Sequence, residues 1–242
     1  MPTTRQAARR SAARQEILDT ARAQMAESGA AALSLRAVAR QMQLTAPALY
    51  RYFTDRDALV TALIVAAFNA LADSLAAARD ADPAAGVSQR LLAIGLAYRA
   101  WALAHPQDYL LIFGTPLPGY TAPAEITGPA AKRSFDVLAE ALRPARLGAA
   151  RWGRAFQAAP AALQAQVAAW RARYGYDVSG EALLFALETW TRIHGLVSLE
   201  LVGQIEPFFG EAGALYHYEM LKLIDAAGLQ PVAAVTKKRT RQ

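Results

Sequence analysis

Residues 35–59 of the chain have the sequence LRAVARQMQLTAPALYRYFTDRDAL, and this stretch decides the fold. The spacing of its apolar side chains predicts two short helices, over residues 35–42 and 46–52. Residues 43–45 between them can form only a tight turn, and the hydroxyl of Thr45 can cap the second helix. The stretch therefore predicts a helix-turn-helix.

The flanking residues predict a bracing helix on either side of this stretch. The first covers residues 14–28, and Gly29 follows where a helix-closing glycine is expected. The second covers residues 55–80, and Thr54 with Asp57 has a spacing close to a capping box. In such a unit the second short helix lies in the major groove of DNA.

The two faces of helix 46–52 suit that placement. Its outer face must approach base edges closely, and Ala46, Pro47 and Ala48 leave that surface bare. Leu49 and Phe53 lie four residues apart and can anchor the helix to a core. The alternative is that these apolar side chains form an ordinary core stripe with no DNA beside it.

Charge is distributed unevenly along the chain, whose net charge is +6. Residues 1–60 hold nine arginines against five acidic residues, and the last six residues add four more cations. This asymmetry indicates an anionic polymer as the partner of the N-terminal part. An arginine-rich composition without a binding role is the competing interpretation.

Both chain ends are predicted to be disordered and basic. Residues 1–12 form the predicted N-terminal arm, which carries Arg5, Arg9 and Arg10 and no large apolar side chain. These arginines either lie in a minor groove or along phosphates, or remain solvated and idle. Residues 231–242 form the predicted tail, from which we expect little contribution.

Residues 46–59 resemble the hallmark of the TetR family: two small residues, Leu-Tyr and Phe at fixed spacing, then a basic residue, an acid and Leu. The resemblance implies that Arg36 reaches a base. It further implies that Ala46, Pro47 and Ala48 face the groove and that Thr45, Tyr50, Tyr52 and Arg56 hold phosphates. Two departures are visible: Gln43 stands where the turn usually has glycine, and Arg56 replaces the commoner lysine.

Beyond residue 80 the pattern predicts a C-terminal helical bundle. The predicted helices cover residues 88–104, 106–114, 129–143, 160–174, 179–202 and 211–227, with a long loop over 115–128. Residues 146–159 are ambiguous. The chain is thus expected to be all-α with nine or ten helices, a helix-turn-helix domain over residues 13–60 and a ligand-binding and dimerisation domain over residues 61–230.

The segments around Trp190, His194 and Gly195 and over residues 105–114 resemble a TetR subgroup marked by a Trp-His-Gly pattern. On helix 179–202 a stripe of small residues would permit close approach of another helix. We therefore expect a homodimer through the last two long helices. The expected interface residues are Thr191, Gly195 and Ser198.

The bulky stripe of the same helix is expected to face inward and to help line a ligand pocket. The candidate pocket residues are Trp101, Tyr109, Phe113, Trp170, Trp190 and His194. Aromatic side chains at helical spacing also form plain cores, so this alternative stays open. Because few charged residues fall there, the ligand is expected to be apolar or aromatic.

These observations predict a sequence-specific transcriptional regulator, a repressor that a small molecule releases from double-stranded operator DNA. We expect it to be cytoplasmic, to need no cofactor or metal and not to be an enzyme, since no catalytic or metal-binding motif surrounds its three histidines. The chain contains no cysteine, and no membrane partner is expected. The alternative is a helical small-molecule carrier or adaptor without DNA activity.

Overall fold

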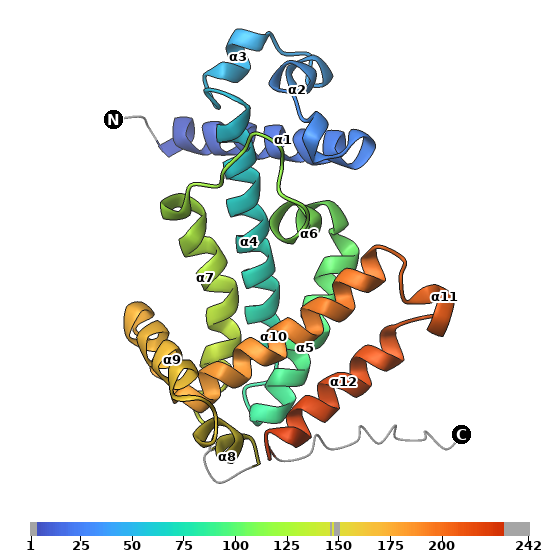
Figure 1. The fold of residues 1–242 in the computed structure, drawn as a ribbon. Coiled ribbons are helices and arrows are strands. Elements are labelled where there is room, and N and C mark those ends of the chain that lie inside the picture. The colour runs from blue at the N-terminus through green and yellow to red at the C-terminus, as the bar shows by residue number, and fades with distance from the viewer. Residues whose placement is uncertain (1–3, 146, 148–150, 230–242) are drawn as a thin grey trace, which may run out of the picture. The chain divides into compact units, whose positions relative to one another are not determined.

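The computed structural model describes residues 4–145, 147 and 151–229, and this part of the chain is all-α, as predicted (Figure 1). The described residues form twelve α-helices and one short 3-10 helix, and no strand. The helices are α1 (Thr4–Ser28), η1 (Ala30–Ala32), α2 (Leu35–Gln41), α3 (Ala46–Tyr50), α4 (Arg56–Asp80), α5 (Val87–Ala104), α6 (Pro106–Phe113), α7 (Ala124–Ala141), α8 (Arg151–Gln157), α9 (Ala161–Tyr174), α10 (Gly180–Leu201), α11 (Glu206–Phe209) and α12 (Gly213–Ala226).

The chain folds into two compact units. The first contains the described residues up to 72 together with residues 102–134, and the second contains residues 73–101 together with the described residues from 135 onward. Helices α4, α5 and α7 each run from one unit into the other. The predicted functional boundary after residue 60 therefore does not coincide with the division into compact units.

In the first unit, α1 crosses below α2 and α3 in the view of Figure 1, and α4 begins beside it. One apolar core joins them. It includes Ile17 and Met25 from α1, Val38 from α2, Leu49 from α3 and Leu63 from α4, all 1% exposed or less. Burying side chains of this size contributes about 1.5–3 kcal/mol each relative to leaving them in water. This core holds the helix-turn-helix in place.

In the second unit, α5 and α12 approach each other closely at Gly95. A Cβ at this position would overlap the end of the Met220 side chain, which would have to move aside, so glycine permits the close approach. The hydroxyl of the buried Tyr216 donates a 2.6 Å hydrogen bond to the Gly95 carbonyl. Arg99 of α5 adds a charged link, because its Nε lies 2.8 Å from a carboxylate oxygen of Glu200 on α10.

The structure corrects the sequence prediction for the N-terminal arm. Residues from Thr4 onward are the first turns of α1, whereas disorder was predicted over 1–12. Alanine, arginine and glutamine dominate this stretch and are strong helix formers. They also extend a helix that the buried Ile17 already anchors, so no new nucleation is needed. The predicted basic tail over residues 231–242 lies outside the described residues.

Two further elements differ from the prediction. Helix α7 begins at Ala124, so the predicted loop ends at residue 123 and Pro129 lies inside the helix. Pro129 is the sixth residue of α7, so it lacks the N–H that would bond to the carbonyl of residue 125. Helix α11 was not predicted, because four residues are too few to show a period. The ambiguous stretch over residues 146–159 contains α8.

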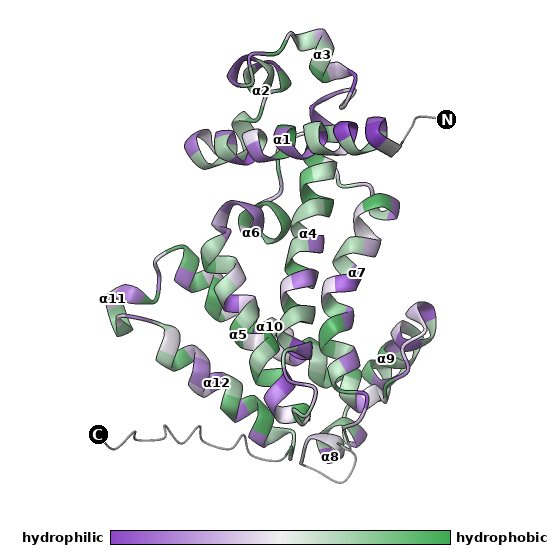
Figure 2. Ribbon diagram, turned by 180° about the vertical axis from the view of Figure 1, so that it is seen from behind, coloured by the Kyte–Doolittle hydropathy of each residue, from purple (hydrophilic) through white to green (hydrophobic). Residues whose placement is uncertain are grey.

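Helix α4 is mostly apolar, with a few hydrophilic turns (Figure 2), and is the one described helix long and apolar enough to cross a membrane. Its side chains that recur every four residues are nevertheless buried inside the protein. These are Leu59, Leu63, Ala67, Leu71 and Leu75. We therefore interpret α4 as a core helix.

Candidate nucleic-acid interface

The turn between α2 and α3 depends on an unusual backbone conformation at Gln43. Its φ is 55°, in the left-handed region that favours glycine, and it is the one non-glycine residue with positive φ in the described chain. The amide of Leu44 then donates a 2.8 Å hydrogen bond to the Ala39 carbonyl, which closes the end of α2. The turn therefore keeps a glycine-like shape although glutamine occupies it.

Helix α3 is anchored on one side and open on the other. Leu49 is fully buried and Phe53, just after the helix, is 2% exposed. The guanidinium of Arg14 on α1 lies 4.5 Å from the centre of the Phe53 ring, which adds a cation–π contact. Tyr50, on the other side of α3, keeps 43% of its surface exposed. The helix thus presents a polar hydroxyl outward from an apolar anchor.

The structure brings the predicted DNA contacts together on α2, α3 and the first turn of α4. Four of them are exposed, namely Arg36, Thr45, Pro47 and Tyr50. Four are partly buried, namely Ala46, Ala48, Tyr52 and Arg56. Thr45 precedes α3 with extended backbone, but its side chain makes no capping hydrogen bond. Its hydroxyl therefore does not close the helix end as expected.

Arg56 has a structural role that the sequence did not indicate. Its guanidinium donates to the carbonyl oxygens of Leu33, Ala30 and Ala31 at 3.1, 3.4 and 3.3 Å. These carbonyls belong to η1 and the residue after it, so Arg56 ties the start of α4 to the segment that leads into α2. A DNA phosphate bound by Arg56 would have to accept hydrogen bonds from a guanidinium that already donates to these backbone carbonyls.

A second feature missed by the sequence analysis links α1 to α6. Arg22 Nε lies 3.0 Å from both carboxylate oxygens of Asp108, whose side chain is 7% exposed. Arg22 also pairs with Asp19 on its own helix at 2.8 Å. The two residues of the α1–α6 pair lie 86 positions apart, so spacing along the chain gives no sign of their contact.

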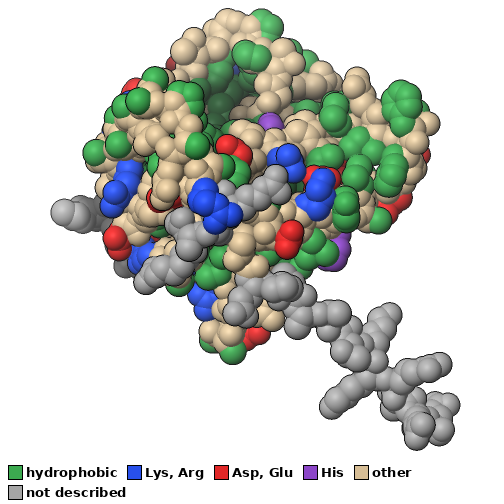
Figure 3. All heavy atoms as spheres, turned by 60° about the horizontal axis from the view of Figure 1, so that its bottom comes forward, with side chains coloured by type: hydrophobic (Ala, Val, Ile, Leu, Met, Phe, Trp, Pro, Cys, Tyr) green, Lys and Arg blue, Asp and Glu red, His purple; other side chains and the backbone are tan. Residues whose placement is uncertain are grey.

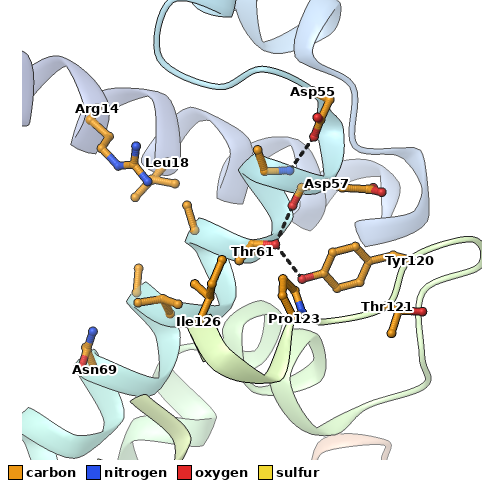
Figure 4. Close-up of a pocket in the computed structure, with 14 residues that line it drawn as sticks. Arg14, Leu18, Asp55, Asp57, Thr61, Asn69, Tyr120, Thr121, Pro123 and Ile126 are labelled. Atoms are coloured by element: carbon orange, nitrogen blue, oxygen red, sulfur yellow. Dashed lines mark hydrogen bonds between the residues drawn. The ribbon is translucent and has the colours of Figure 1, made fainter. Parts of the chain in front are cut away.

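The first unit also contains an open cleft of about 640 Å³ between α1, the start of α4 and residues 120–126 (Figure 4). We call it the α1–α4 cleft. The Thr61 hydroxyl donates to the Asp57 carbonyl at 2.8 Å, so the Tyr120 hydroxyl donates to Thr61 at 2.9 Å. These three residues line the α1–α4 cleft together with Arg14, Leu18, Asp55, Ala58, Ala62, Val65, Ala66, Asn69, Thr121, Pro123 and Ile126.

The six residues predicted to line one ligand pocket lie in different surroundings. Tyr109 and Phe113 belong to the first unit, with ring centres 5.2 Å apart. In the second unit Trp170 packs against Phe135 at 5.2 Å, and Trp101 is buried. None of the six lines the α1–α4 cleft. The aromatic pocket remains a prediction.

His194 and Trp190 form a small cluster on α10. Their ring centres are 5.0 Å apart, and the Tyr98 hydroxyl lies 2.8 Å from His194 Nδ1. Burial lowers the pKa of His194 below its ordinary value, because the charged ring is poorly solvated there. The neutral ring is therefore favoured in the folded protein.

The predicted dimer contacts lie on a partly open face of the second unit. Thr191 is exposed, Gly195 and Ser198 are partly buried, and a Cβ at Gly195 would meet no atom within 4 Å. Hydrophobic side chains gather at the right of Figure 3, on the side where Figure 1 shows α11 and α12. Exposed large hydrophobic residues on α10, α11 and α12, or directly after α10, are Leu199, Val202, Phe208, Phe209 and Tyr218.

Comparisons with known proteins match both parts of the chain. The family described as "Bacterial regulatory proteins, tetR family" matches residues 17–63, which contain the helix-turn-helix. The family described as "Tetracyclin repressor-like, C-terminal domain" matches residues 91–223. The narrower Trp-His-Gly subgroup stays a prediction.

Individual relatives agree with these matches. The HTH-type transcriptional regulators Rv1816 of Mycobacterium tuberculosis and Mb1846 of Mycobacterium bovis are each 34% identical over 189 residues, 78% of this chain and 80% of theirs. The crystal structure of the regulatory protein SCO4313 is 39% identical with a TM-score of 0.75, over 93% of this chain and all of that one. A Rhodococcus sp. RHA1 protein of unknown function, 24% identical over 89% of this chain and 94% of its own, shares the fold with a TM-score of 0.61. The chain therefore belongs to the TetR family of bacterial transcriptional regulators, with a helix-turn-helix DNA-binding domain near its N-terminus.

Proposed function

We propose that this regulator is a cytoplasmic, non-enzymatic repressor that binds a two-part operator as a homodimer and leaves it when a small apolar molecule binds. The observation that carries the proposal is the arrangement of α3. Its buried Leu49 fixes the helix while Tyr50 and the small residues 46–48 remain available to a DNA groove.

Each predicted contact has a distinct role in this proposal. Arg36 contacts a base edge, and residues 46–48 permit close approach to the groove. Thr45, Tyr50, Tyr52 and Arg56 hold backbone phosphates, which position the protein without selecting the sequence.

Dimerisation is supported by the uncovered apolar surface of α10, α11 and α12. Phe208 is 91% exposed and Val202 is 57% exposed, which is unusual for apolar side chains that face only water. Two copies would cover this surface and place the two α3 helices, one from each copy, on two half-sites of the operator. Light scattering at micromolar concentration should give twice the 26.0 kDa chain mass, and Val202→Glu should shift it toward the monomer.

Control by a small molecule has two candidate sites. One is the α1–α4 cleft, which touches α1 and the start of α4 and so adjoins the helices that hold α3. The other is the predicted aromatic pocket around Trp190. A thermal-shift screen of small apolar compounds should find a ligand that also releases DNA. If the ligand binds in the α1–α4 cleft, Ala66→Trp should abolish the thermal shift. If the ligand binds in the aromatic pocket, Trp190→Ala should abolish the thermal shift.

The central experiment selects duplexes from a random pool with the purified protein and then measures binding by fluorescence anisotropy. The proposal predicts a recovered two-part site and an affinity that falls steeply with salt. Transcription in vitro from a promoter that overlaps the selected site should decrease when protein is added. A protein that recovers no sequence, yet binds an apolar compound, would instead be a carrier or adaptor.

A further inference from the structure

A second concave surface lies at the N-terminal end of α1, where this helix passes the residues that follow α3. It has a volume of about 480 Å³ and is lined by Gln6, Arg9, Arg10, Arg51 and Tyr52. We call it the arginine cleft. It carries three guanidinium groups and no carboxylate, and the hydrophilic end of α1 that contributes to it is visible in Figure 2.

No carboxylate of the described residues neutralises the charges in this cleft. Arg9, Arg10 and Arg51 are exposed, and within the described residues none of them forms an ion pair. Other arginines of the chain do form such pairs: Arg22 with Asp108, and Arg99 with Glu200. Bringing like charges together without a counter-charge costs free energy that an anionic ligand would recover. Guanidinium groups match phosphate oxygens well, because each can donate two parallel hydrogen bonds.

The position of the cleft points to the phosphates of a DNA backbone. Arg51 and Tyr52 directly follow Tyr50, the last residue of α3 and a proposed phosphate contact. A duplex held by α3 therefore passes within reach of residues 51 and 52. DNA presents a regular row of phosphates there, whereas a single free phosphate would gain little on so open a surface.

We propose that the arginine cleft holds backbone phosphates of the operator outside the bases read by α3, so that the first turns of α1 belong to the DNA-binding surface. This inference rests on the proposed function. It assigns Arg9, Arg10 and Arg51 to positioning of the duplex rather than to base recognition. Because residues 4–12 are already helical, binding need not order a flexible arm, and less conformational entropy is lost.

The test compares Arg9→Gln/Arg10→Gln with the wild-type chain on a duplex selected from the random pool. Anisotropy titrations at several salt concentrations give the slope of log affinity against log salt. This slope is negative, and each lost phosphate contact should reduce its magnitude by about 0.9. The slope of the double variant should therefore be smaller in magnitude by about 1 to 2. Affinity should fall equally for all site variants, because phosphates carry no sequence information.

The matched control is Arg171→Gln/Arg173→Gln, which removes the same charge from exposed positions on α9. Its salt slope should equal that of the wild type. Arg51 lines the same cleft from the position directly after α3. Arg51→Gln should therefore also reduce the magnitude of the slope. Circular dichroism and urea unfolding establish that each variant is folded before it is compared.

Equal slopes for the wild type and the double variant would overturn the inference while leaving the proposed function intact. It would also be overturned if inorganic phosphate stabilised the DNA-free wild type but not the double variant, with the DNA slope unchanged; the cleft would then hold a free anion. A wild-type chain without sequence-selective binding would overturn the proposed function as well.

Discussion

Gln43 holds the turn of the helix-turn-helix in a backbone conformation that disfavours side chains. Its φ of 55° costs about 1–2 kcal/mol for a residue other than glycine. Gln43→Gly should relieve this strain, partly offset by the greater freedom of glycine in the unfolded chain, and raise the free energy of unfolding by about 0.5–1 kcal/mol. Urea unfolding measures the change.

Two controls define what this measurement means. Gln43→Val should lower the free energy of unfolding, because a β-branched residue tolerates positive φ poorly. Gln41→Gly, at the last residue of α2, should also lower it, by about 0.5 kcal/mol. If glycine at position 43 destabilised the protein as glycine at position 41 does, the backbone strain at the turn would be refuted.

Tyr50 and Arg36 are both exposed but should differ in what they contribute. Tyr50→Phe removes one proposed phosphate contact and should weaken binding to every site variant by a similar factor, about 3–10-fold. Arg36→Ala removes the proposed base contact and should flatten the preference at one position by about 1–3 kcal/mol. Competition titrations with single-base site variants separate the two outcomes. Identical profiles for both variants would show that the roles are assigned wrongly.

His194 should make the second unit sensitive to acid. Its pKa is lowered by burial in the folded protein, whereas the unfolded chain keeps a value near 6.5. Above pH 6.5 both states hold a neutral ring; as pH falls below 6.5 the unfolded chain takes up a proton more readily, so the free energy of unfolding decreases. His194→Gln can keep a hydrogen bond to Tyr98 and should lose this part of the decrease between pH 7 and 5. An unchanged pH profile in that variant would contradict the assignment.

Among the contacts between elements, the pair formed by Arg22 of α1 and Asp108 of α6 should be the most costly to break. Asp108→Ala leaves a partly buried guanidinium short of its main partner and should lower the free energy of unfolding by about 2 kcal/mol. The control is Asp177→Ala, whose pair with Arg143 is exposed and 3.8 Å long and should be worth less than about 0.5 kcal/mol. Equal losses in both variants, measured by urea unfolding, would argue against this link.

Elements with local signals were the ones that the sequence could predict. Helix α4 starts within a residue of the predicted position because its four-residue repeat is local. Its predicted cap was wrong: the Ala58 amide donates to Asp55 at 2.7 Å, and the Thr54 hydroxyl donates to Asp55 instead of capping the helix. The start of helix α7 was predicted wrongly at Pro129, because a proline commonly opens a helix. The helix begins instead at Ala124, although Thr127 and Gly128 before the proline are poor helix formers, so their local propensity does not reveal this start. The first turns of α1 were missed because they lack large apolar residues and depend on the anchored helix behind them.

At the scale of the whole molecule, the family and the DNA-binding helices could be recognised from residues 35–59, but the contacts that assemble the site could not. Arg22 with Asp108, and Arg51 with Arg9 and Arg10, come together only through the fold. The six aromatic residues expected in one pocket share helical spacing, which does not determine whether they meet. The sequence therefore predicts helix α3 better than it predicts the long-range contacts around that helix.

Sequence-selective binding to duplex DNA is the claim on which the other proposals depend. The most direct measurement is the ratio of affinities for the selected duplex and a scrambled duplex of equal length and composition, by anisotropy at one fixed salt concentration near physiological. Sequence-selective binding predicts a ratio of about 10³ or more. Ala48→Glu should abolish it, because it would place a carboxylate on the side of α3 that we propose faces the groove. Equal affinities for the two duplexes would contradict it.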